Sequence, residues 1–235
     1  MGTVLKGGTV IELEPASVER VDLRVDGGRI AARAPMLAPL PDDEVVDVNG
    51  KLVMPGMVCA HHHLYSSLAR GVPPASPPPE NFQEILERIW WRLDRALTLD
   101  AVHVSATVGA LDALLCGTTT IVDHHASPSA IEGSLTRVAR GVNEVGLRGI
   151  LCYEVTDRAG PEGREWGLAE NDAFIRKAQG RFRGMVGAHA SFTLEHEALR
   201  MLRQLVDSTG AALHIHLAED PSDERLSFER LATCR

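Results

Sequence analysis

Short segments of alternating or β-branched residues mark the beginning of the chain as β structure. They cover residues 9–11, 21–25 and 45–48. Asp26-Gly27-Gly28 and Asn49-Gly50 supply hairpin-type turns, because glycine readily adopts the positive φ that such turns need. The alanine- and proline-rich residues 31–41 are predicted to form a loop. The pattern therefore predicts an all-β segment over residues 1–54.

From residue 55 onwards, apolar runs alternate with segments of helical periodicity, a pattern typical of a parallel α/β architecture. The first predicted strand is buried; it begins at Val53 and, apart from Pro55-Gly56, runs to His63. The other predicted strands are residues 118–123, 149–155, 184–189 and 211–217. The predicted helices lie at residues 82–93, 98–116, 128–145, 168–178 and 194–209, with N-caps at Asn81, Thr98, Ser127 and Thr193 and a polar loop at 158–167.

These elements make five β/α units. A closed (β/α)8 barrel needs roughly 250 residues by itself, so the chain is expected to contain about three units too few. We therefore predict an α/β fold in which residues 1–54 form a β segment and residues 55–235 form a partial (β/α)8 TIM-type barrel. An incomplete barrel with an exposed edge is also expected to have poor solubility.

Two pairs of alternate histidines end two of the predicted strands. Side chains alternate faces along a strand, so His61 and His63 point to one side and His62 to the other. His214 and His216 repeat the arrangement, and either of them could bind a metal ion. Two imidazoles on one face can hold one divalent ion, and two such pairs indicate a metal-dependent hydrolytic site.

Other histidines also lie at the carboxyl ends of predicted strands, where the active sites of parallel α/β barrels are found. The residues at or just after these ends are His61, His63, His124, His125, His189, His214, His216 and Glu219. His189 is interpreted as a substrate contact, whereas His124 and His125 are equally compatible with a structural role. Only His103 and His196 fall in predicted helices.

Zinc is the ion that these imidazoles suit best, with iron as the alternative. A catalytic zinc keeps an open position for water and lowers the pKa of that water toward about 7, which prepares it to attack an electrophilic carbon. Glu219 follows His216 by three residues and could reach such a water as a general acid/base. A solvated carboxylate at the rim is the alternative interpretation of Glu219.

Composition narrows the choice of partners. The net charge of −8 and the isoelectric point near 5.7 argue against nucleic acid or an anionic membrane as the main partner. Residues 1–10 do not resemble a leader peptide, and no apolar run approaches the roughly 18 residues of a membrane helix. The chain has four cysteines without CxxC spacing, Cys59, Cys116, Cys152 and Cys234. Three of them lie in apolar segments, which favours reduced thiols and a cytoplasmic location.

Several motifs resemble the amidohydrolase superfamily, and more narrowly its cytosine/guanine deaminase and chlorohydrolase branch. The first is Pro55-Gly56-x4-His61-x-His63, continued by residues 64–71. Residues 117–127 and 187–194 are similar to the same branch. The segment Cys152–Arg158 and the motif His214-x-His216-x-x-Glu219-Asp220 resemble the aminohydrolase group called SsnA. The resemblance covers residues 1 to about 224.

The resemblance implies a metal ion on His61, His63 and His216, with Glu219 as the proton shuttle. It also implies a small β-sandwich at residues 1–54 and a substrate contact at His189, to which we add His124 and Arg70. Binuclear members use a carboxylated lysine near the end of the fourth strand. No lysine lies between residues 188 and 200, so a mononuclear site fits better.

The family also uses a histidine after the sixth strand and an aspartate after the eighth, which are expected to lie beyond this chain. We therefore weigh a metal-dependent aminohydrolase or deaminase of a small nitrogen heterocycle against an inactive, metal-binding remnant of such an enzyme. A binuclear cyclic amidase is disfavoured by the missing lysine. A homo-oligomer, or association with a chain that supplies the missing units, is expected.

Overall fold

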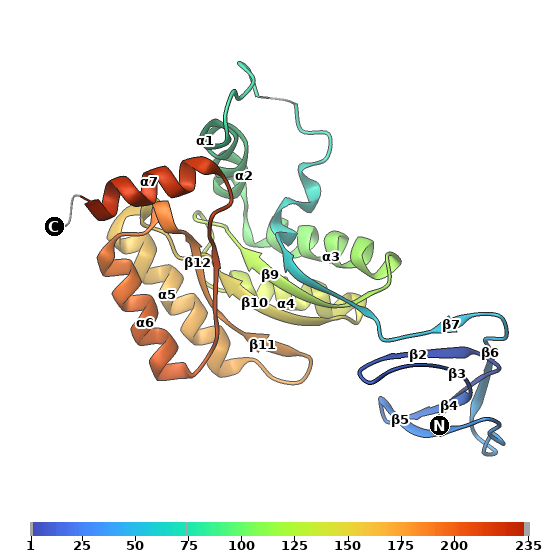
Figure 1. Ribbon diagram of the computed structural model, residues 1–235. Coiled ribbons are helices and arrows are strands. Elements are labelled where there is room, and N and C mark those ends of the chain that lie inside the picture. The colour runs from blue at the N-terminus through green and yellow to red at the C-terminus, as the bar shows by residue number, and fades with distance from the viewer. Residues whose placement is uncertain (1, 74, 233–235) are drawn as a thin grey trace. The chain divides into compact units, whose positions relative to one another are not determined.

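The computed structural model describes residues 2–73 and 75–232, with side chains described as far as residue 229 (Figure 1). Cys234 lies outside the described residues. The chain divides into two compact units, Met1–Gly56 and Met57–Arg235, which are taken separately below. No described helix is both long and apolar enough to cross a membrane, although the bent pair Phe82–Ala96 and Leu99–Leu115 passes the length and composition criteria together.

The first unit consists of two small sheets, with strand orders β5-β4-β1-β6 and β3-β2-β7. Its strands are β1 (Thr3–Lys6), β2 (Thr9–Leu13), β3 (Ala16–Arg20), β4 (Asp22–Asp26), β5 (Arg29–Ala34), β6 (Glu44–Asp47) and β7 (Leu52–Val53). Val10, Val21 and Leu23 form its buried core. The prediction of a loop over residues 31–41 is wrong for residues 31–34, which belong to β5. The turn at Gly27-Gly28 feeds directly into β5, which pairs with β4.

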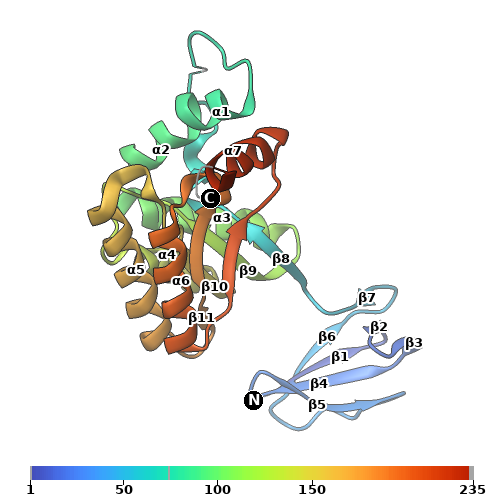
Figure 2. The same ribbon diagram turned by 60° about the vertical axis from the view of Figure 1, so that its left-hand side comes forward.

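The second unit contains the five parallel strands that the sequence predicts, the fourth of which is divided into β11 and β12. Strands β8, β9 and β10 are adjacent, β11 continues the sheet beside β10, and β12 pairs with β13. Strands β11 and β12 are separated by Met185 alone, and a bridge between Val155 and Ala188 links the two groups of strands. The strands therefore follow one another in chain order, and Figures 1 and 2 show α4, α5 and α6 on one side of them.

The bounds of these elements are β8 (Met57–His62), η1 (Leu64–Ala69), α1 (Phe82–Ile85), η2 (Leu86–Trp90), α2 (Trp91–Ala96), α3 (Leu99–Leu115), β9 (Thr118–His125), α4 (Ser134–Val145), β10 (Arg148–Tyr153), η3 (Asp157–Ala159), α5 (Gly160–Lys177), β11 (Phe182–Gly184), β12 (Val186–Ala190), η4 (Ser191–Thr193), α6 (His196–Thr209), β13 (Leu213–His216) and α7 (Pro221–Ala232). The prediction of an α/β fold with these alternating elements is confirmed.

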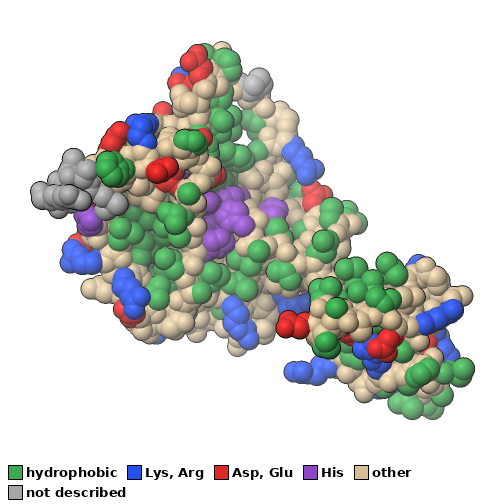
Figure 3. All heavy atoms as spheres, in the orientation of Figure 1, with side chains coloured by type: hydrophobic (Ala, Val, Ile, Leu, Met, Phe, Trp, Pro, Cys, Tyr) green, Lys and Arg blue, Asp and Glu red, His purple; other side chains and the backbone are tan. Residues whose placement is uncertain are grey.

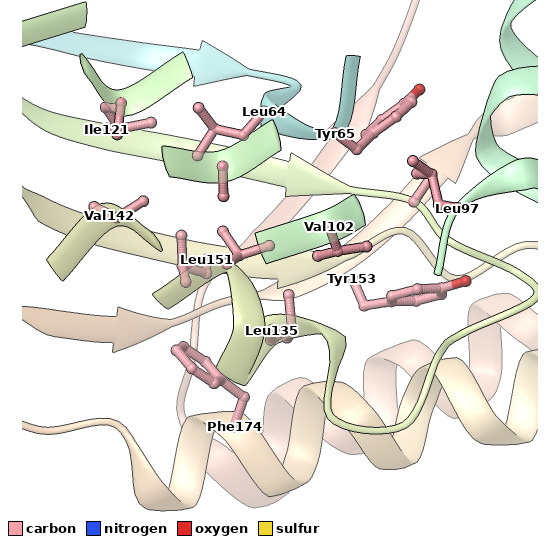
Figure 4. Close-up of a cluster of buried hydrophobic side chains, with 14 of the residues drawn as sticks. Leu64, Tyr65, Leu97, Val102, Ile121, Leu135, Val142, Leu151, Tyr153 and Phe174 are labelled. Carbon is pink, nitrogen blue, oxygen red and sulfur yellow. The ribbon is translucent and has the colours of Figure 1, made fainter. Parts of the chain in front are cut away.

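The hydrophobic core lies between the sheet and the helices that cover it (Figure 4). Leu64, Val102, Ile121, Leu135 and Leu151 are completely buried there, although they come from five different elements. Strand β8 differs from the prediction of a buried strand. Its residues Met57 and Val58 are 61% and 63% exposed, because within the described residues β8 is paired only with β9 and its other edge is uncovered.

Two of the predicted N-caps are confirmed and two are wrong. The side chain of Asn81 accepts a hydrogen bond from the amide of Glu84, and Thr98 caps α3 in the same manner. Ser127 does not start a helix; it donates instead to the carbonyl of Ala130, and α4 begins only at Ser134. Thr193 lies in η4, since its hydroxyl bonds back to Ala190, and α6 begins at His196.

The polar loop predicted at residues 158–167 is also wrong, because α5 already begins at Gly160. Its polar residues are used in contacts with other segments: Arg164 forms an ion pair with Asp157 at 2.7 Å. The three described cysteines differ in burial. Cys152 is buried and Cys59 half-buried, but Cys116 is exposed at the end of α3.

Helix α4 is capped by a carboxylate from another helix. Gly133 precedes α4 and has no side chain to serve as a cap. The buried Glu170 on α5 accepts hydrogen bonds from the amides of Gly133 and Leu135, at 2.8 and 2.9 Å. A carboxylate also stabilises the positive end of the helix dipole. Glu170 thus joins α4 to α5 by accepting hydrogen bonds from two amides at the start of α4.

Replacing Glu170 with alanine is expected to reduce the free energy of unfolding by about 2–3 kcal/mol, because two backbone donors lose their acceptor. Urea denaturation followed by circular dichroism measures this difference. Glu165→Ala, an exposed position on the same helix, is the matched control and is expected to have an effect below about 0.5 kcal/mol. Equal effects of the two substitutions would contradict the capping role.

Candidate metal centre

Three histidine rings converge at the carboxyl ends of β8 and β13. His61 lies in β8, His63 follows it directly, and His216 ends β13. The Nε2 atom of His63 lies 3.1 Å from Nε2 of His61 and 3.1 Å from Nε2 of His216, and the remaining side of this triangle is 3.2 Å. Figure 3 shows histidine side chains gathered on this face of the second unit.

Backbone carbonyls determine which nitrogen of two of these rings carries the proton. His63 Nδ1 lies 2.7 Å from the carbonyl oxygen of His124, and His216 Nδ1 lies 2.6 Å from that of His189. A carbonyl oxygen can only accept, so both Nδ1 atoms donate and both Nε2 atoms present lone pairs. Each carbonyl belongs to the end of the neighbouring parallel strand, and therefore the fold itself orients the two rings.

The third ring is oriented by another histidine. Nδ1 of His61 lies 2.9 Å from Nε2 of His214, and donation of the Nδ1 proton leaves Nε2 of His61 with a lone pair as well. Three lone pairs that face one another repel unless a cation lies between them. Hydrogen bonds from the second nitrogen of a metal-binding histidine are the usual means of orienting it.

The triangle fits a divalent metal ion. Three nitrogen atoms bound to a tetrahedral zinc at about 2.0–2.1 Å lie about 3.3–3.4 Å apart, close to the separations found here. Burial, together with the neighbouring histidines, lowers the pKa of His61 to about 4 and that of His63 to about 3. Both rings are therefore neutral at pH 7, as metal ligands must be.

A cavity of about 160 Å³ adjoins two of these rings. We call it the histidine cavity. It is lined by His63, His216, His189, Glu154, Glu219, Phe82, Trp90 and Trp91, among others. Glu219 lies just after β13 and is exposed at the mouth. His189 is buried, and its Nδ1 lies 2.7 Å from the hydroxyl of Thr193, which fixes the ring in place.

The structure does not bring the other two predicted substrate contacts to the histidine cavity. His124 is completely buried, with Nε2 3.0 Å from the carbonyl oxygen of Ala188 and Nδ1 3.3 Å from Glu154. Arg70 has 84% of its side chain exposed and pairs with Asp112 at 3.0 Å. Arg70 lines a separate cavity with His62, the histidine that was expected to face away.

Two functional candidates escaped the sequence analysis. Glu154 is buried and follows β10 directly, as several of the histidines follow their strands. It lies in the segment Cys152–Arg158 that resembles the family, but no role was predicted for it. One oxygen of Glu154 accepts a hydrogen bond of 3.1 Å from Arg158, which also pairs with Asp94 and lies 4.7 Å from the centre of the Trp91 ring. Nothing in the sequence indicated that Trp91 lines the cavity.

A second group of potential ligands is less suited to a cation. It consists of His63, His124 and Glu154. His63 belongs to both groups, and in the second one the guanidinium of Arg158 places a positive charge beside Glu154. The donors therefore favour the group of His61, His63 and His216 and a single metal ion.

The buried histidines also predict how stability depends on pH. Burial lowers the pKa of His125 to about 3 and that of His189 to about 4, against about 6.5 in the unfolded chain. Between pH 7 and pH 5 the unfolded chain takes up protons that the folded chain does not, so the folded state loses stability as the pH falls. Each such histidine contributes about 2 kcal/mol over this range.

The metal-free protein is therefore expected to be several kcal/mol less stable at pH 5 than at pH 7. In His125→Asn the difference between the two pH values should shrink by about 2 kcal/mol. Urea denaturation at both pH values measures it, with substitution of the exposed His196 by asparagine as the control. An unchanged difference in His125→Asn would exclude the buried neutral ring as its cause.

The chain is similar to proteins of a known family. A family model described as the amidohydrolase family matches residues 52–229. The chain is 33% identical to a 5-methylthioadenosine/S-adenosylhomocysteine deaminase of Symbiobacterium thermophilum over 224 residues, which cover 92% of this chain and 49% of that protein. The chain thus spans about half the length of the curated relatives it matches.

Solved structures show the same fold. An adenosine deaminase from Xanthomonas campestris with bound zinc superimposes with a TM-score of 0.82 at 20% identity, over 98% of this chain and 52% of that one. The guanine deaminase of E. coli gives a TM-score of 0.79 at 18% identity, over 99% and 56% of the two chains. The predicted partial barrel is therefore confirmed by structures that contain it as a part.

Proposed function

Because this chain belongs to the amidohydrolase family, we propose that it carries the metal-binding part of a deaminase-type hydrolase, which cleaves a non-peptide carbon–nitrogen bond of a nitrogen heterocycle. The observation that carries the proposal is the convergence of the Nε2 lone pairs of His61, His63 and His216. The names of the relatives support this class of reaction, since they are deaminases of adenosine derivatives or of guanine.

His61, His63 and His216 would hold one divalent ion, for which zinc is the proposed choice and iron the alternative. Such an ion acidifies a water molecule and polarises the carbon–nitrogen bond of the substrate. Glu219 is the proposed proton carrier: its carboxylate lines the histidine cavity with His63 and His216. It would accept a proton from water and deliver it to the ring nitrogen or the departing amine.

The walls of the histidine cavity suit a flat heterocycle. Phe82, Trp90 and Trp91 provide aromatic surfaces against which a planar ring can stack. His189 uses Nδ1 in its bond with Thr193 and has Nε2 left for a polar group of the substrate. His124 would act indirectly, by fixing His63 through its carbonyl group. We withdraw Arg70 as a substrate contact, because it pairs with Asp112 and does not line this cavity.

We also propose that this chain, when loaded with metal, deaminates a substrate without a second polypeptide. The rival function is metal binding without catalysis. The exposed apolar residues Met57 and Val58 on β8 support association with a second polypeptide, either another copy or a chain that supplies further barrel units. A cytoplasmic location is likewise proposed, supported by the unpaired thiols of Cys59 and Cys152.

The test is ammonia release by the zinc-loaded chain, compared with the same chain after metal removal. The substrates to supply are 5-methylthioadenosine, S-adenosylhomocysteine, 5'-deoxyadenosine, adenosine and guanine, the compounds in the names of the relatives. Zinc-dependent release from one of them supports the hydrolase. A folded chain that binds zinc but releases no ammonia from any of them would support the metal-binding alternative.

A further inference from the structure

The turn that carries Glu219 contains a strained residue. Ala218 has a φ of +56°, in the left-handed region that costs a residue with a Cβ atom about 1 kcal/mol or more. It lies between the proposed ligand His216 and the proposed proton carrier Glu219. The direction in which the chain leaves β13 therefore depends on contacts that stabilise the left-handed conformation of Ala218.

A buried carboxylate supplies that stabilisation. Asp223 on α7 is 1% exposed, and its Oδ2 accepts a hydrogen bond of 2.7 Å from the amide of Ala218. Its Oδ1 accepts a hydrogen bond from the hydroxyl of Ser191, and the hydroxyl of Ser227 lies 3.2 Å from the same oxygen. Ser191 is the first residue after β12, two residues after His189. One carboxylate thus joins the ends of β12 and β13.

Helix capping does not account for Asp223. In a capping box, the third helical residue binds back to the amide of the N-cap residue. The N-terminus of α7 already has a separate acceptor, because Asp220 binds the amide and the hydroxyl of Ser222 at 2.8 and 2.6 Å. Asp223 reaches two residues further back, to the strained turn. The helix end and the Glu219 turn are therefore served by two different carboxylates.

We propose that Asp223 is a positioning residue, which holds the Ala218 turn so that Glu219 faces the histidine cavity at a fixed place relative to His189. Its role in catalysis rests on the proposed function of Glu219, but the contact itself does not. Because Asp223 is tied to Ser191, the two cavity residues Glu219 and His189 keep their relative positions even though they come from different strands.

The contact is tested first by NMR on the full chain. A residue with positive φ gives a strong nuclear Overhauser effect between its own amide and α protons, and the amide bound to Asp223 should exchange slowly. In Asp223→Ala, exchange of the Ala218 amide is expected to accelerate at least about tenfold and the positive-φ signal to weaken. Ser191→Ala should have a smaller effect of the same sign. Asp220→Ala, which removes only the helix cap, should leave both signals unchanged.

The catalytic role is tested with ammonia release by the zinc-loaded chain. Asp223→Ala is expected to lower kcat at least about tenfold with KM and zinc content nearly unchanged, and to cause no further loss in a Glu219→Gln background. A further loss in that background would overturn the positioning role. Unchanged exchange and an unchanged positive-φ signal in Asp223→Ala would overturn the proposal outright. If the native chain has no turnover, the proposed function fails for this chain, while the NMR result still decides whether Asp223 holds the turn.

Discussion

His61→Ala is expected to abolish zinc binding with little change in the fold. The native chain should hold about one zinc ion, and the variant should lose more than about 100-fold in affinity, because a three-histidine site loses one of its ligands. His61 is exposed and its ring contacts other histidines rather than the hydrophobic core, so its removal should not unfold the chain. Elemental analysis of the purified protein and titration with zinc measure the loss.

The chain offers two graded controls for this experiment. His62→Ala removes the neighbouring imidazole, which lines a different cavity, and should leave zinc binding intact. His214→Ala removes only the ring that orients His61 and should weaken binding by about 10–100-fold. Zinc retained in a variant that lacks both His61 and His63 would show that the ion binds elsewhere.

Glu219→Gln is expected to leave zinc content unchanged and to lower ammonia release by about 10²–10⁴-fold. Glutamine has nearly the same shape as glutamate but cannot accept and return a proton. The ligand triangle does not include Glu219, which explains why binding should survive. Steady-state kinetics on the best substrate of the panel, together with zinc analysis of the same sample, separates the two effects.

Glu224→Gln is the matched control for Glu219→Gln, because Glu224 is an exposed glutamate at the start of α7. It should retain the native rate. A Glu219→Gln variant with the native rate would remove Glu219 from the mechanism and leave the proton transfer to another group of the histidine cavity.

Much of this site could be predicted from local sequence patterns. The spacing His61-x-His63 places two rings on the same side because side chains alternate along a strand, and this requires no knowledge of the partners of that strand. The spacing of His216 and Glu219 depends in the same way on where a strand ends. The family was recognisable for the same reason, since its motifs are short and continuous.

The errors have a common cause in contacts between distant segments. The start of α4 was misplaced because its capping carboxylate, Glu170, lies on the next helix, 37 residues away from Gly133. Arg70 lies in a motif next to the histidines, but its ion pair with Asp112 directs it away from them. Local propensity cannot anticipate an interaction whose partner is brought close only by the fold.

Local sequence is sufficient to predict the α/β class, the alternation of strands and helices, and the imidazoles at the strand ends, because each depends on residues close together in the chain. Which nitrogen atoms face one another depends instead on how distant strands pack. His63 and His216 present Nε2 because carbonyl groups of adjacent strands bind their Nδ1 protons. The tertiary structure likewise added Glu154, Trp91 and Asp223, since residues far apart in the chain form one cavity only when parallel strands end at the same edge of a sheet.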